Sequence, residues 1–204
     1  MNLKDSQTRI NLMRSFAGES QARNRYTYAA EAAKSQSLHV IEAVFKFTAN
    51  QEKEHGKIFY NFLKEMTGEN ITIDGSYPVD IYDDVLKLLR SAQHNEFEEF
   101  EPVYPDFAAV ANQEGFTNIG AKFNQIAKIE KTHGDRFGMF ADLLEQGKLF
   151  VSDVEEEWMC LNCGYVHKSS EAPKSCPVCS HPQGYFVRLK LCLLYTSPSP
   201  RDCS

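Results

Sequence analysis

Apolar residues recur three and four positions apart through most of residues 1–150. This spacing places them on one face of a helix, so it predicts amphipathic α-helices rather than strands. A stretch at 67–80 that contains glycine and proline, together with shorter breaks, divides the pattern into segments. We therefore expect an all-α four-helix bundle, whose long helices cover 8–36, 39–66, 81–114 and 117–147.

Charged residues interrupt the apolar stripe of the second and fourth segments at the same phase. The second stripe reads Ile41, Phe45, Thr48, Glu52, His55, Phe59 and Phe62. The fourth stripe reads Ile119, Phe123, Ile126, Glu130, His133, Phe137, Phe140 and Leu144. Residues three apart share a helix face, so each Glu-x-x-His pair can present an oxygen and a nitrogen to one site. A single such pair is typical of a solvated surface, but two in matched phase favour a metal site.

The first and third segments also turn carboxylates toward the predicted core. Glu19 and Arg23 lie on the first stripe, and Glu96 and Glu99 lie on the third. A buried ionised carboxylate costs several kcal/mol even after relaxation, so these stripes need cationic partners that Arg23 alone cannot supply. Two metal ions would balance the charge, with the ligands Glu19, Glu52, His55, Glu96, Glu99, Glu130 and His133. Carboxylate-bridged dimetal bundles use this kind of donor set.

Three further residues bear on this site. Tyr26 and Tyr104 are either ordinary core aromatics or hydrogen-bond donors to the metal ligands. Pro102 lies inside the third segment, where it removes a backbone donor and tends to kink the helix. Because the apolar phase resumes at Val103 and Phe107, we expect a kinked but continuous helix.

Four cysteines form two C-x2-C pairs in the C-terminal part of the chain, namely Cys160, Cys163, Cys176 and Cys179. Two short chelate loops can place four thiolates tetrahedrally around one ion. Two disulfides or a redox-active dithiol are the alternatives, and a reducing cytoplasm disfavours both. Thiolate tetrahedra suit zinc and iron alike, so the spacing leaves the metal open.

Composition and charge narrow the class of protein. The 204 residues allow one ordinary domain and a small one, and 42% apolar with 25% charged residues is typical of a globular protein. A net charge of −6 argues against binding to nucleic acid or to an anionic membrane. No apolar run approaches the roughly 18–20 residues of a membrane span, and the first residues lack the apolar stretch of a signal peptide. We therefore expect a cytoplasmic protein.

Several motifs together resemble those of the rubrerythrin family. They are Phe16–Tyr26 (FAGESQARNRY), Gln51–His55 (QEKEH), Tyr104–Ala108 (YPDFA), Trp158–His167 (WMCLNCGYVH), Ala172–Pro173 and Cys176–Cys179 (CPVC). The resemblance extends over nearly everything from Ser6 to Lys190. It implies a ferritin-like bundle over 1–148, a linker over 149–157 and a rubredoxin-like domain over 158–190. Residues 191–204 are expected to be a sequencing-adapter artefact or a disordered tail.

The resemblance also implies the metals and their ligands. A non-haem diiron centre would lie in the bundle, and one iron would be held by the four cysteines. By position, Glu52 and Glu130 match bridging ligands, Glu19 and Glu96 match terminal ligands, and His133 would hold one iron.

The second iron is implied to exchange ligands. Glu99 would hold it in the oxidised state and His55 in the reduced state, and Glu99 is the ligand that a plain ferritin-like centre lacks. On this interpretation the catalytic residues are Glu52, His55, Glu99 and Glu130.

The activity implied by the resemblance is that of a peroxidase, an oxidoreductase that reduces hydrogen peroxide to water in oxidative-stress defence. Electrons would pass through the thiolate iron from a rubredoxin or an NAD(P)H-dependent reductase, because the chain has no Gly-x-Gly-x-x-Gly loop of its own. A head-to-tail homodimer or a higher oligomer is expected. The alternative is a ferroxidase or iron-handling ferritin-like protein with a structural zinc ribbon.

Overall fold

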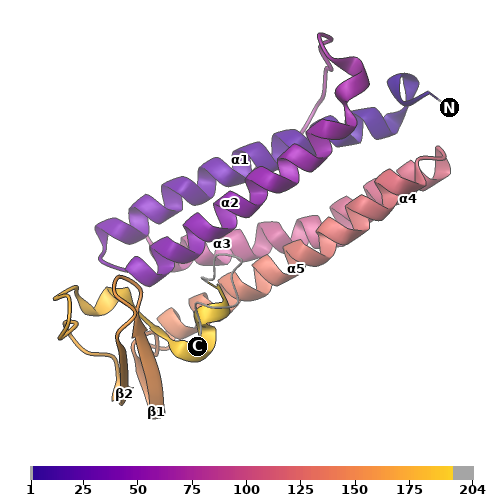
Figure 1. Cartoon of the computed structure of the whole chain (residues 1–204). Helices are drawn as coiled ribbons and strands as arrows, with labels where there is room; N and C mark the ends of the chain where they lie inside the picture. The colour runs from indigo at the N-terminus through magenta and orange to yellow at the C-terminus, as the bar shows by residue number, and fades with distance from the viewer. Residues whose placement is uncertain (1, 195–204) are drawn as a thin grey trace.

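Two antiparallel helix pairs form the N-terminal part of the molecule, as Figure 1 shows for this computed structural model, which describes residues 2–194. The first pair is α1 (Gln7–Ser35) and α2 (His39–Phe62), and the second is formed by α3 (Val85–Glu98), α4 (Tyr104–Gln113) and α5 (Thr117–Glu145). The prediction of a helical bundle followed by a small four-cysteine domain is confirmed. The second helix ends earlier than expected, and the third begins later.

The predicted kink in the third helix is present, but the helix is not continuous. A π-helical turn, Glu99–Val103, joins α3 to α4, and Glu101 has φ −158° and ψ 108°, outside the helical region. Pro102 explains this, because it lacks a backbone donor and disfavours the helical conformation for the residue before it. Glu99 itself keeps helical dihedral angles, so its side chain still follows the phase of α3.

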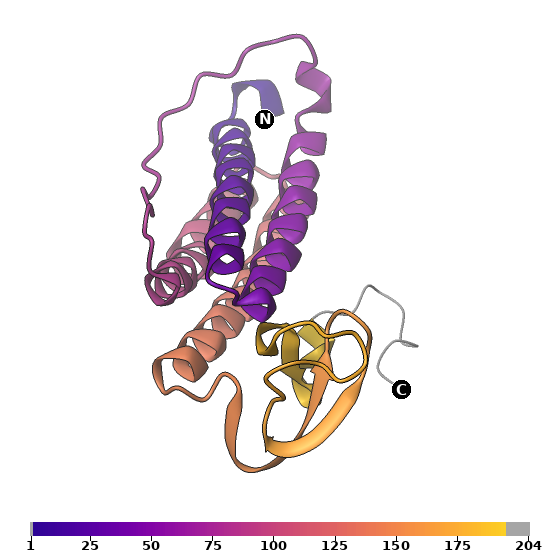
Figure 2. The same ribbon diagram turned by 90° about the vertical axis from the view of Figure 1, so that its left-hand side faces the viewer.

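A long extended connection between α2 and α3 returns along the whole length of the bundle (Figure 2). We call residues 69–83 the strap. The Asp80 carboxylate holds the strap to the bundle by accepting hydrogen bonds from Arg25 on α1 and from Asn95 on α3, each at 2.8 Å. Arg14 forms a second anchor through its ion pair with Asp74. The strap therefore closes the side of the bundle between α1 and α3.

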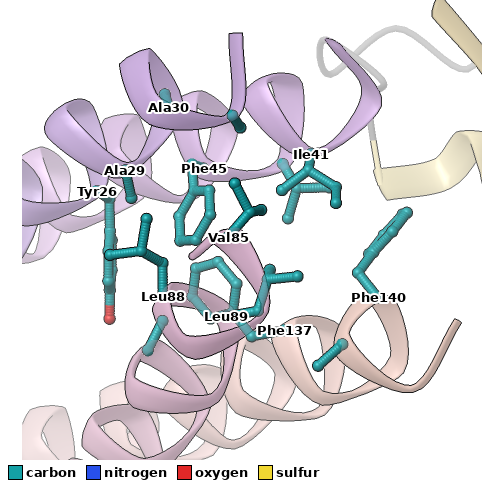
Figure 3. Close-up of a cluster of buried hydrophobic side chains, with 14 of the residues drawn as sticks. Tyr26, Ala29, Ala30, Ile41, Phe45, Val85, Leu88, Leu89, Phe137 and Phe140 are labelled. Carbon is teal, nitrogen blue, oxygen red and sulfur yellow. The ribbon is translucent and has the colours of Figure 1, made fainter. Parts of the chain in front are cut away.

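The bundle core consists of two apolar clusters with a polar layer between them. One cluster joins α1, α2, α3 and α5, and it includes Phe45, Leu89 and Phe137 (Figure 3). The other cluster lies toward α4 and includes Phe59 and Ile126. The two Glu-x-x-His pairs fall between these clusters on α2 and α5, so apolar side chains cover the polar layer at both ends.

The C-terminal domain is a three-stranded antiparallel sheet in the order β2-β1-β3, built from β1 (Val151–Cys160), β2 (Val166–Glu171) and β3 (Phe186–Arg188). Trp158 on β1 is fully buried, and its indole N–H donates to the carbonyl of Ser169 at 3.0 Å. The strand β1 begins inside the segment that the sequence suggests as a linker. The predicted tail overlaps a short 3-10 helix, Leu189–Leu194, and its remaining residues lie outside the described part of the chain.

The domain packs against the end of its own bundle, at the turn between α1 and α2. The Tyr185 ring stacks on the ring of His39 with centroids 4.1 Å apart. A Cβ at Gly184 would lie 1.8 Å from the carbonyl oxygen of Ser37, so only glycine fits at this contact. Across residues 2–194, none of the helices has the length and apolar character that crossing a membrane requires.

Candidate metal centres

The polar layer of the bundle contains a first group of possible metal ligands around His55. Its Nδ1 atom lies 2.9 Å from Glu130 Oε1, 3.0 Å from Glu52 Oε2 and 3.9 Å from Glu19 Oε2. All four side chains are buried, and one ligand atom from each lies within 4.8 Å of the others. Three helices, α1, α2 and α5, thus converge on one position that could hold an ion.

A second group lies beside the first, around His133. Its Nδ1 atom lies 2.8 Å from Glu130 Oε2, 3.1 Å from Glu52 Oε1 and 3.4 Å from Glu96 Oε2. Glu52 and Glu130 belong to both groups and present a different oxygen to each histidine. The His55 and His133 rings are 5.6 Å apart and nearly parallel. The geometry is that of two adjacent ligand sets joined by two shared carboxylates.

Unsatisfied buried atoms in this layer fit metal ions. In the described part of the chain, the ligand atoms without a hydrogen-bond partner include Glu19 Oε2, Glu52 Oε1, Glu96 Oε2, both carboxylate oxygens of Glu130 and both ring nitrogens of His133. Buried polar atoms in native proteins are normally paired, and carboxylate with imidazole is a common donor set for iron and zinc. Arg23, which the sequence places on the same stripe, is exposed and does not neutralise the layer.

Burial and the close approach of the carboxylates also shift the pKa values in the polar layer. Burial raises the pKa of Glu96 to about 8, and the charge on Glu52 adds to this effect. Burial and the charge on Glu130 raise the pKa of Glu19 well above its ordinary value. Burial alone would also raise the pKa of Glu52, but His133 and His55 together lower it to about 2. Without positive charge, the layer cannot hold all of its carboxylates ionised.

Two tyrosines donate hydrogen bonds to the outer carboxylates. The Tyr104 hydroxyl donates to Glu19 Oε1 at 2.6 Å, and the Tyr26 hydroxyl donates to Glu96 Oε1. Both tyrosines are buried, and each occupies one carboxylate oxygen while the other oxygen, Oε2, points toward a histidine. Such outer contacts orient metal ligands in many proteins.

Glu99 is the one predicted bundle ligand that stands outside both groups. It is only partly buried, and it lines a cavity of about 520 Å³ between α1, the strap and the start of α4. Burial and the charges of Glu130 and Glu96 raise its pKa well above the ordinary value, so Glu99 still lies within electrostatic reach of the polar layer. The structure therefore brings six of the seven predicted bundle ligands together and leaves the seventh beside them.

The four cysteines gather at one end of the C-terminal sheet. Cys160 Sγ lies 3.7 Å from Cys179 Sγ, and Cys163 Sγ lies 3.6 Å from Cys176 Sγ. These distances are far longer than the bond of about 2.05 Å in a disulfide. They fit a tetrahedral ion, because metal–sulfur bonds of about 2.3 Å separate the sulfurs by about 3.8 Å. The backbone N–H of His181 contributes to lowering the pKa of Cys179 to about 6, which favours the thiolate.

Sequence reasoning missed the residues of the strap that border Glu99. Tyr77 belongs to the lining of the same cavity, and its hydroxyl donates to the carbonyl oxygen of Arg14 at 3.3 Å. The strap has no helical or strand periodicity, so no pattern indicated which of its side chains would face the bundle. The one local signal in the sequence was an aromatic residue, Tyr77, directly before a proline in a mostly polar segment.

Two family models match the two parts of the chain that contain the candidate metal centres. The family model described as Rubrerythrin matches residues 11–141, and the one described as Rubrerythrin, rubredoxin-like domain matches residues 158–187. A rubrerythrin of Clostridium perfringens is 46% identical over 190 residues, which cover 93% of this chain and 97% of that protein. A rubrerythrin of Nitratidesulfovibrio vulgaris is 40% identical over 188 residues, covering 92% of this chain and 97% of that protein.

Solved structures show the same architecture. Nigerythrin in a partially reduced state has a TM-score of 0.59 and 28% identity, with 90% of each chain covered. A bacterioferritin of Desulfovibrio desulfuricans has a TM-score of 0.63 at 21% identity, covering 72% of this chain and 86% of that chain, which indicates the ferritin-like fold alone.

Proposed function

The chain belongs to the rubrerythrin family, and from this premise we propose that it is a non-haem diiron peroxidase that reduces hydrogen peroxide to water. The observation that carries the proposal is the pair of ligand groups joined by Glu52 and Glu130, in one chain with a four-cysteine group. Two adjacent metal ions can together supply the two electrons that cleave an oxygen–oxygen bond. Two protons complete the conversion of one peroxide molecule into two of water.

Each bundle ligand takes a defined role in this proposal. Glu52 and Glu130 would be the shared ligands of two irons, because each presents one oxygen to each histidine. Glu19 and Glu96 are terminal ligands, held by Tyr104 and Tyr26.

The histidines and Glu99 complete the two ligand sets. His133 holds one iron beside Glu96. His55 would hold the other iron in the reduced state, and Glu99 would hold it in the oxidised state. The position of Glu99 supports this role, because it lies at the edge of the polar layer with a helical backbone and a partly exposed side chain.

In this proposal the four cysteines would hold an iron that supplies electrons to the bundle. Within one chain, the domain contacts the bundle at His39, which precedes Glu52 by 13 positions on α2. At 1.5 Å per residue this places the contact about 20 Å from the polar layer. A head-to-tail homodimer, in which the domain serves the partner's bundle, would shorten the route. The external donor would be a rubredoxin or an NAD(P)H-dependent reductase.

Two measurements on the iron-loaded protein test the proposal. Ferric iron bound by thiolates is strongly coloured and zinc is not, so we expect a red protein. The Glu52→Ala variant should lose peroxide consumption, because both ligand groups lose a shared carboxylate. Glu54→Ala is the matched control, because Glu54 lies on the same helix but is exposed.

The opposite results have clear meanings. Peroxide consumption that persists in Glu52→Ala would contradict the catalytic assignment. A colourless four-cysteine domain that binds zinc, together with iron oxidation by the bundle, would indicate the ferroxidase alternative instead.

A further inference from the structure

The cavity beside Glu99 is larger than the proposed reaction requires. Its volume is about 520 Å³, within the range of about 300–1,000 Å³ typical of sites for small organic molecules. Hydrogen peroxide has about twice the volume of a water molecule, whose share of the liquid is about 30 Å³. Peroxide would therefore fill only a small part of the cavity. The remaining space could accommodate the organic part of a larger peroxide.

The walls of the cavity combine apolar and polar side chains. Tyr77 and Pro78 of the strap contribute apolar surface, together with Val103 at the end of the π-helical turn and Phe107 of α4. Glu99 and Tyr104 line the cavity toward the polar layer. The other polar and charged lining residues are Arg14, Ser15, Gln21, Arg25, Asp74, Ser76, Asn95 and Glu98. Apolar walls with a few convergent polar groups are characteristic of small-molecule sites. A ligand that is apolar at one end and polar at the other would match this arrangement.

Gly18 of α1 lines the cavity beside Glu99. A Cβ at Gly18 would lie 3.8 Å from Glu99 Oε1 and 3.9 Å from Tyr77 Cε1. Because glycine has no side chain, this space between the strap and the carboxylate is free. A larger residue here would fill the route from the apolar walls to Glu99.

The basic residues of the cavity are already neutralised. Arg14 is paired with Asp74, and Arg25 is paired with Asp80 at 2.8 Å. These ion pairs hold the strap on both sides of Tyr77, so the outer wall is an anchored part of the fold. They also leave the cavity better suited to a neutral ligand than to an anion.

We propose that this cavity binds the apolar substituent of an organic hydroperoxide, so that the protein reduces such hydroperoxides as well as hydrogen peroxide. The proposal rests on the proposed diiron peroxidase function. The oxygen–oxygen bond of the hydroperoxide breaks, and two protons and two electrons yield the corresponding alcohol and one water. The electrons come from the same external donor through the thiolate iron. The organic substituent itself is unchanged and leaves bonded to the hydroxyl group of the alcohol, while the outer oxygen of the hydroperoxide leaves as water.

The test compares two substrates of the iron-loaded protein, supplied with its reductant. We measure kcat/KM for cumene hydroperoxide and for hydrogen peroxide and take the ratio of the two values. The Val103→Phe variant places a larger side chain in the cavity and reduces the space for the substituent. A misfit on the scale of one methylene in an apolar pocket changes specificity by about 10–200-fold. We expect the ratio, cumene hydroperoxide over hydrogen peroxide, to fall at least tenfold. Tyr77→Ala opens the outer wall and should raise the ratio. Tyr28→Ala is the control, because Tyr28 is exposed on α1 outside this cavity.

Binding of the product alcohol provides a readout that does not depend on turnover. Broadening of the proton resonances of 2-phenyl-2-propanol should reveal its binding to the wild-type protein and weaker binding to Val103→Phe. Reduction of hydrogen peroxide without reduction of cumene hydroperoxide would overturn this proposal alone. A ratio and an alcohol affinity that Val103→Phe leaves unchanged would also overturn it. Failure to reduce either peroxide would overturn the peroxidase function as well.

Discussion

Heating should unfold the metal-free bundle at a clearly lower temperature than the metal-loaded bundle. Seven ligand atoms of the polar layer are buried without a hydrogen-bond partner among the described residues. A buried polar group left unpaired costs about 1–3 kcal/mol. Ions that bind the folded chain, and not the unfolded chain, remove this cost and stabilise the fold by mass action.

The expected size of the shift follows from the number of ions. One ion at about 100 times its dissociation constant adds about 2.7 kcal/mol to the free energy of unfolding, so two ions add about 5 kcal/mol. In a chain of 204 residues, each kcal/mol changes Tm by about 2–4 °C. The loaded protein should therefore melt about 10–20 °C above the metal-free protein.

Circular dichroism of the helical signal, followed under anaerobic conditions with and without ferrous iron, measures this shift. The helical signal reports the bundle rather than the small sheet domain. The double variant Glu52→Gln/Glu130→Gln keeps the size of both shared side chains and leaves the four cysteines intact. Most of the shift should disappear in this variant, because both ligand groups of the bundle lose their shared carboxylates. Equal melting temperatures for loaded and metal-free wild-type protein would refute the reasoning that ions compensate the buried carboxylates.

Three further predictions concern contacts outside the polar layer. Glu114→Ala should cost about 0.5–2 kcal/mol in urea unfolding, because the Glu114 carboxylate accepts the backbone N–H groups of Gln7 and Thr8 at the start of α1, each at 2.8 Å. The pKa of Glu114 is lowered, so this loss should be complete at neutral pH and should shrink as the pH falls below the ordinary value of 4.5. Gly184→Ala should release the C-terminal domain from the bundle, because the new Cβ would clash with the Ser37 carbonyl oxygen. The measurement is the rate of proteolysis of the segment before β1, which should increase; an unchanged rate would contradict this. Cys179→Ser should abolish the red colour and donor-dependent turnover, while a chemically reduced bundle still consumes peroxide once; retained colour would contradict the four-cysteine assignment.

Much of the fold could be predicted from the sequence, because helical periodicity is a local property. The matched stripes gave the four helices, and the two C-x2-C pairs gave the small domain. Helix ends were less predictable, since the 3-10 turn after Phe62 and the late start at Val85 depend on where the strap leaves and rejoins the bundle. Pro102 indicated a kink, but the sequence alone did not indicate that Glu101 would leave the helical region.

The polar layer was predictable for the same reason as the helices. Carboxylates and imidazoles at core positions need partners, so their phase on the stripes indicated that they would meet. The cavity was not predictable, because it depends on the anchoring of the strap by Asp74 and Asp80 to residues far away in the sequence. The capping of α1 by Glu114 was also missed as a specific contact. Its partners lie more than 100 positions away, beyond the reach of any local pattern.

The sharing of Glu52 and Glu130 between the two ligand groups has a thermodynamic consequence. Neither position in the layer can be filled without changing the charge and orientation of carboxylates that belong to the other. Occupation of the two positions is therefore cooperative or anticooperative, but not independent. By linkage, the factor by which the first ion changes the affinity for the second is the same whichever position is filled first.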